Sequence, residues 1–150
     1  MAGFGHRLPH FRSTCLGVGA VFALIASGEL LQGVSRALDG FGVPPHVLAS
    51  AHYHDAMVWV FVHMLVKGLI IAVVGHYAQG ERLRLAFARV MVVAMAIFAM
   101  LDIRTSDSPL GNGLYAGARS LVPPIMGLII LALFLHLALC RAAVADPKAG

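Results

Sequence analysis

The chain has 150 residues, of which 59% are hydrophobic and only 12% are charged. An ordinary soluble domain carries about 25% charged residues, so a soluble fold of this length could not cover so much apolar surface, and we expect lipid to cover it. The net charge of +4 does not indicate a nucleic-acid partner, because the basic residues stand at the ends of apolar runs and do not cluster with aromatic residues.

Four apolar stretches are each about long enough to cross the apolar core of a bilayer as a helix, which takes about 20 residues. They cover residues 15–37, 56–77, 85–103 and 121–142. None of them alternates with the period of two that a transmembrane β-strand shows. The sequence therefore predicts an all-α integral membrane protein, in which residues 1–150 form one domain built as a four-transmembrane-helix bundle.

The first stretch has a second interpretation. Arg7 and Arg12 precede an apolar run, and residues 26–28 are small, which is also typical of a cleaved secretory signal peptide. The apolar character resumes at Leu30 and Leu31, so the segment is longer than the core of a usual signal peptide. We therefore expect it to be retained as a membrane-spanning helix.

The distribution of basic residues predicts the orientation, because the loops richer in Lys and Arg stay on the cytoplasmic side. One side of the predicted bundle collects Arg7, Arg12, Arg82, Arg84, Arg89, Arg141 and Lys148. The other side has only Arg36, Arg104 and Arg119. Both termini and the loop at residues 79–84 are thus expected to be cytoplasmic, and the longer loops 38–55 and 104–120 are expected to lie outside.

Two Pro-Pro steps, at residues 44–45 and 123–124, predict the starts of the second and fourth helices, since proline is well tolerated in the first helical turn. The second helix would then begin near Pro45. It would extend beyond the bilayer and carry a histidine-rich outer segment.

Four ionisable residues stand at the depth of the membrane, where a bare charge costs about 3 kcal/mol. They are Glu29, His63, Lys67 and Asp102. His63 and Lys67 are four residues apart and share one face of the second helix. We expect Glu29 on the first helix to pair with Lys67 or His63, either as a structural ion pair that holds the two helices together or as a site for protons, ions or substrate.

A second group of polar residues belongs to the first outer loop. His46, His52, His54 and Asp55 offer imidazole and carboxylate ligands, and together they suit a divalent metal. The His-Tyr-His-Asp run is not a recognised metal signature. The alternative is that these are interfacial histidines that bond to loops or water.

Two further histidines lie within helices near the cytoplasmic side. Four-helix membrane bundles can hold haem b between histidines on facing helices, and His76 with His136 is the candidate pair. Their estimated depths differ by about 6 to 9 Å, so a haem between them would need tilted helices. The alternative is one interfacial histidine on each helix.

No Gly-rich phosphate loop, nucleophile elbow or His-Glu-x-x-His zinc motif occurs in the sequence. Enzymatic activity is therefore the less favoured reading. The favoured hypothesis is a small, non-catalytic multi-pass subunit or accessory protein of a larger membrane complex or a homo-oligomer. The alternatives are a small ion, proton or metal transporter that uses the Glu/His/Lys site, and a redox subunit that binds haem or metal. Richness in Ala, Gly, Val and Arg favours a bacterial inner membrane.

Overall fold

The computed structural model describes residues 11–106 and 121–145. Most of the second outer loop, and the basic residues Arg7, Arg119 and Lys148 that entered the orientation count, lie outside these ranges. The described residues contain helices and no strand, in the order α1 (Phe11–Gln32), α2 (Val34–Ala37), α3 (Pro45–Leu48), α4 (Ala51–Tyr77), α5 (Glu81–Ser106) and α6 (Val122–Ala145). Among them α1, α4, α5 and α6 are long and apolar enough to cross a membrane, as the sequence predicted.

The first long helix ends earlier than predicted, at Gln32 instead of Ala37. Gly33 takes φ 85° and ψ 151°, a backbone conformation that is open almost only to glycine. The chain therefore leaves the axis of α1 and resumes as the short helix α2. Val34 and Ala37 of α2 are buried in a small apolar cluster with Phe61 of α4.

The second predicted helix is interrupted as well. Pro45 does begin a helix, as expected, but this helix is the single turn α3, and α4 starts only at Ala51. Ser50 between them has an extended backbone, with φ −73° and ψ 123°, and its carbonyl accepts the first helical bond from the His54 amide. The prediction of one continuous helix from Pro45 is thus wrong, because Ser50 takes the non-helical conformation of an N-cap residue.

The helices α1 and α4 pack against each other through small residues. A Cβ atom added to Gly19 would lie 2.6 Å from the Gly68 carbonyl oxygen, and one added to Gly68 would lie 2.8 Å from the Gly19 oxygen. Gly75 approaches Cys15 just as closely. The predicted contact between the first two spans is present, and it is centred on Gly19 and Gly68. Such small residues let two backbones come close without a hydrophobic driving force.

The helices α5 and α6 form the second packed pair. Three aromatic rings link the two pairs at one end of the bundle. The Phe87 ring of α5 lies 6.1 Å from the Phe11 ring of α1 and 6.1 Å from the Phe134 ring of α6, in both cases edge to face. Phe11 and Phe134 are fully buried and belong to the larger of the two apolar clusters. The two helix pairs are therefore packed together at this end of the bundle.

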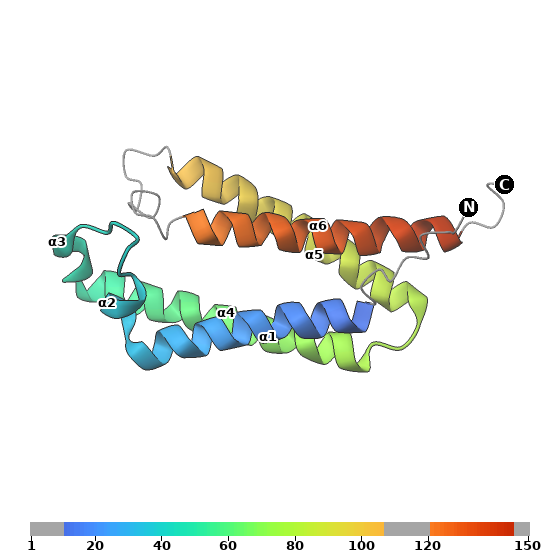
Figure 1. Cartoon of the computed structure of the whole chain (residues 1–150), viewed down its shortest axis with the longest axis horizontal. Helices are drawn as coiled ribbons and strands as arrows, with labels where there is room; N and C mark the ends of the chain where they lie inside the picture. Colours follow the sequence, from blue (N-terminus) through green and yellow to red (C-terminus); the bar gives the residue numbers. More distant parts are fainter. Residues whose placement is uncertain (1–10, 107–120, 146–150) are drawn as a thin grey trace, which may run out of the picture.

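Figure 1 shows that the first residues of α1, the last residues of α6 and the connection between α4 and α5 lie at the same end of the bundle. This arrangement matches the predicted up-and-down order of the four long helices. At the opposite end the α1–α4 pair and the α5–α6 pair diverge (Figure 1).

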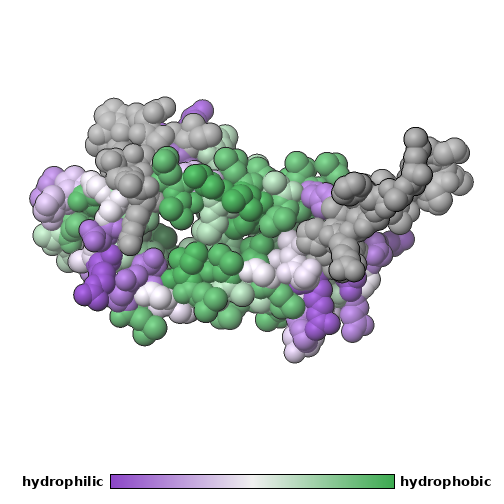
Figure 2. Space-filling view, in the orientation of Figure 1, coloured by the Kyte–Doolittle hydropathy of each residue, from purple (hydrophilic) through white to green (hydrophobic). Residues whose placement is uncertain are grey.

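The face of the bundle seen in Figure 2 is apolar along its middle and more polar toward both ends. Large apolar side chains point outward from the long helices; Leu24 is 73% exposed and Val90 is 63% exposed. A soluble monomer rarely exposes a continuous apolar surface of this extent. The pattern is typical of a multi-pass membrane protein.

Candidate functional site

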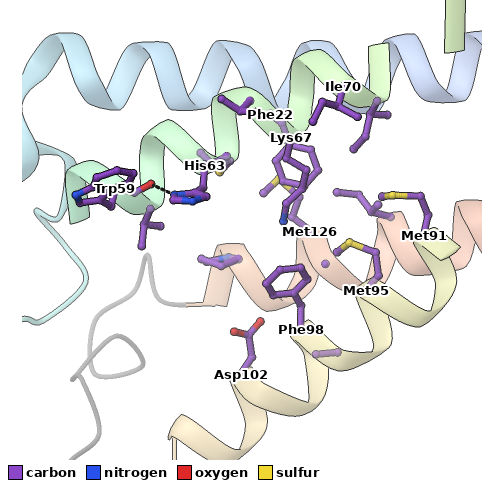
Figure 3. A pocket seen from close by; sticks show the side chains of 18 of the residues that line it. Phe22, Trp59, His63, Lys67, Ile70, Met91, Met95, Phe98, Asp102 and Met126 are labelled. Carbon is purple, nitrogen blue, oxygen red and sulfur yellow. Dashed lines mark hydrogen bonds between the residues drawn. The ribbon is translucent and has the colours of Figure 1, made fainter. Parts of the chain in front are cut away.

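A cavity of about 880 Å³ lies where the two helix pairs diverge, and it opens to the surface between them. Its walls come from α4 on one side and from α5 and α6 on the other, and Phe22 of α1 also lines it. The lining is mainly aromatic, aliphatic and methionine side chains. Among the described residues that line it, the ionisable ones are Lys67, His63 and Asp102 (Figure 3).

Lys67 extends from the middle of α4 into this cavity. Its Nζ atom lies 3.9 Å from the centroid of the Phe98 ring on α5 and 5.4 Å from the centroid of the Phe22 ring on α1. Within residues 11–106 and 121–145, no carboxylate lies within ion-pair distance of this ammonium group. In this part of the chain, these distances place the ammonium group on aromatic faces, which attract a cation.

His63 lies one helical turn before Lys67 on the same face of α4. Its Nδ1 atom is 2.7 Å from the Trp59 carbonyl oxygen. A carbonyl oxygen can only accept, so Nδ1 carries the hydrogen and donates it, and in the neutral ring Nε2 is the acceptor. The Trp59 ring packs on the imidazole at 5.5 Å between centroids, which fixes the orientation of the ring.

Glu29 does not join this site. Its carboxylate accepts a hydrogen bond from Gln32 on its own helix. The predicted pair of Glu29 with Lys67 or His63 is not formed. For Lys67, the register of α1 against α4 explains why. Lys67 lies beside Phe22, and the seven residues from Phe22 to Glu29 correspond to about 10 Å along the helix.

Asp102 lies on α5, on the wall of the cavity that faces α4 (Figure 3). Of the four polar residues predicted to share a membrane site, three thus line one cavity, while Glu29 stands apart. The cavity combines a cation, an imidazole and a carboxylate with walls that are otherwise apolar. Sites of this kind bind small molecules, because few polar groups set orientation while apolar walls supply most contact area.

The predicted metal ligands are not brought together. His54 Nδ1 lies 3.9 Å from Asp55 Oδ1, and both side chains are exposed. His46 lies on α3 and His52 in the first turn of α4, both exposed to solvent. In the part of the chain that the structure describes, no three His, Cys, Asp or Glu side chains are close enough to hold a metal ion.

The two predicted haem ligands, His76 and His136, lie on different helix pairs and contact other side chains. The His76 Nδ1 atom lies 3.2 Å from a guanidinium nitrogen of Arg12, and its ring packs edge to face on Tyr77. His136 is half-buried on α6. Because α4 packs mainly on α1 and α6 mainly on α5, the two histidines do not belong to one closely packed helix pair.

The sequence analysis did not predict the residues that form the opposite wall of the cavity. Met91, Met95 and Phe98 of α5, with Met126 of α6, face α4 across the cavity (Figure 3). The spacing of the three α5 residues, at i, i+4 and i+7, could have placed them on one helix face. It could not have indicated that this face borders a cavity and not lipid.

Neither a protein-family model, nor a curated protein, nor a solved structure matches this chain. The interpretation of the cavity therefore depends on its own geometry.

Proposed function

We propose that the protein is a four-span membrane protein that acts by binding, as a small non-catalytic subunit whose cavity between the two helix pairs holds an apolar or amphipathic molecule. The observation that carries this proposal is the cavity itself. Its volume of about 880 Å³ falls within the range of about 300 to 1,000 Å³ that small-molecule sites occupy. It also opens between helices whose outer surfaces are apolar, so a molecule dissolved in the bilayer could reach it sideways.

The orientation and location are part of the same proposal. The excess of Arg at the end of the bundle that holds the α4–α5 connection favours the cytoplasmic side for that end and for both termini. Arg12, Arg82 and Arg84 belong to this end. We infer a bacterial inner membrane as the location. A larger membrane complex or a homo-oligomer is the context in which such a small subunit would act.

We propose binding and not a proton or ion relay because Glu29 bonds to Gln32 of its own helix and forms no ion pair with His63 or Lys67. A relay needs titratable groups within hydrogen-bond reach of one another or of bridging water. His63 and Lys67 offer one such step at most, since both lie on the same helix face, and Glu29 lies about two turns away from the level of Lys67.

Mass spectrometry of the protein released intact from uncharged detergent tests this proposal. We expect a fraction of the protein to carry a co-purified lipid-like molecule, alone or within a larger stoichiometric complex. A variant with a filled cavity, Gly127→Leu, should lose the bound molecule, because a Cβ atom at Gly127 meets only Met95, at 4.0 Å, so a larger side chain can grow into the cavity. Gly28→Leu is the matched control, since nothing lies within 4 Å of its Cβ and it does not line the cavity. Empty wild-type protein would contradict the proposal.

A further inference from the structure

We propose that the cavity binds a single-chain amphiphile with a carboxylate head group, a long-chain fatty acid, whose carboxylate pairs with Lys67 and whose chain lies along the apolar walls. This inference rests on the proposed binding function and names the class of ligand.

The head group is assigned from the charge of Lys67. Its ammonium group lies inside an apolar cavity, and in the described part of the chain its neighbours are the Phe98 and Phe22 rings. A charge at this depth is costly unless it is paired, and two aromatic faces offset only a part of that cost. An anion that enters the cavity would complete the pairing, and a charge-assisted hydrogen bond is stronger than a neutral one.

His63 offers a second contact to the same head group. With Nδ1 held by the Trp59 carbonyl, the other ring nitrogen, Nε2, is left for a ligand. His63 and Lys67 line the same wall one turn apart, so a carboxylate with two oxygens can meet both (Figure 3). Nε2 donates to this carboxylate when the ring is protonated, and it accepts from the acid form when the ring is neutral.

The chain of the ligand is assigned from the remaining walls. Beyond Lys67, the cavity continues between Ile70 and Ile71 of α4 and Met91 and Met95 of α5. Methionine side chains are flexible and adapt to the shape of a bound apolar group. These four side chains are apolar, so an alkyl chain can lie against them without burying a charged group.

The depth of Lys67 favours a fatty acid over a phospholipid. Lys67 lies ten residues before the end of α4 at Tyr77 and sixteen after its start at Ala51, about 15 Å and 24 Å along the helix. A carboxylic acid can reach that depth in its neutral form and ionise beside the ammonium group. A phosphate head group keeps its charge, and phosphate sites favour the bidentate contacts of Arg, which is absent from the described residues that line the cavity.

Binding of radiolabelled palmitate to the full chain in phosphatidylcholine nanodiscs tests the inference. Hexadecanol, with the same chain and no charge, and lysophosphatidic acid, with a phosphate head, serve as competitors. The wild-type protein should bind palmitate saturably and about tenfold more tightly than hexadecanol, as expected for one charge-assisted hydrogen bond. Lys67→Met should remove this preference, so that palmitate binds no more tightly than hexadecanol. Lys148→Met, which removes the other lysine of the chain, should change neither.

Two results would overturn the inference: equal binding of palmitate by the wild type and by Lys67→Met, or tighter binding of lysophosphatidic acid than of palmitate. Gly127→Leu separates this failure from failure of the proposed binding function. If hexadecanol binds to the wild type and not to Gly127→Leu, the cavity is a binding site and only the assignment of the carboxylate is wrong. If no probe binds saturably to protein that is inserted in the membrane, both proposals fall.

Discussion

At the scale of single residues, the close contact of Gly19 with Gly68 sets which side chains of α1 and α4 lie side by side. The cost of charge at membrane depth singled out Glu29, His63, Lys67 and Asp102 from the sequence alone. The pairing depends on the register between α1 and α4, which is fixed by the contact between Gly19 and Gly68. Gly19 and Gly68 are two of 16 glycines in the chain, and nothing in the sequence marks them as neighbours.

The separation of Glu29 from Lys67 predicts that the two side chains contribute independently to stability. We expect the free energies of unfolding of Glu29→Gln, Lys67→Met and the double variant to be additive within about 0.5 kcal/mol. The measurement is reversible unfolding by SDS in mixed micelles. A coupling energy of about 1 kcal/mol or more would mean that an ion pair joins these residues after all.

At the scale of the helices, hydropathy predicted the long elements well, because about 20 apolar residues in a row have few other ways to satisfy their backbone in lipid. The breaks were missed. Gly33 lies inside an apolar run where a glycine is tolerated in a helix, and only its backbone conformation, with φ 85°, shows that α1 stops there. Ser50 likewise interrupts the second predicted helix, because its extended backbone separates α3 from α4.

The close contact of α1 with α4 predicts an unusual response to alanine. In an ordinary helix, Gly→Ala stabilises by up to about 1 kcal/mol. At Gly68 the new Cβ atom would lie 2.8 Å from the Gly19 oxygen and 2.9 Å from the Ala23 nitrogen, both backbone atoms that cannot move aside. We expect Gly68→Ala to lower the free energy of unfolding by about 1 to 3 kcal/mol.

Gly28→Ala is the control for this comparison, because nothing lies within 4 Å of the Cβ atom that it would add. Its unfolding free energy should be unchanged or slightly higher. If Gly68→Ala were as stable as Gly28→Ala, the two helices could not be in the contact that sets the register of the site. Unfolding in SDS, followed by circular dichroism, gives both values.

At the scale of the whole molecule, the order of the four helices was predictable and the division into two pairs was not. Short connections between spans predict antiparallel neighbours, and α4 and α5 are joined by only three residues, Ala78 to Gly80. Yet α4 packs mainly on α1 and diverges from α5, so that the cavity opens between them. Side-chain packing decides this arrangement, and periodicity along one helix carries no record of it.

The proposed binding function depends on the bundle lying across a membrane, with the end that holds the α4–α5 connection in the cytoplasm. The most direct measurement is a set of reporter fusions at positions 40, 79, 112 and 150, each made once with alkaline phosphatase, which is active outside, and once with a fluorescent protein, which is active inside. We expect fluorescence at 79 and 150 and phosphatase activity at 40 and 112. Fusions at 40 and 79 that report the same side would contradict the account.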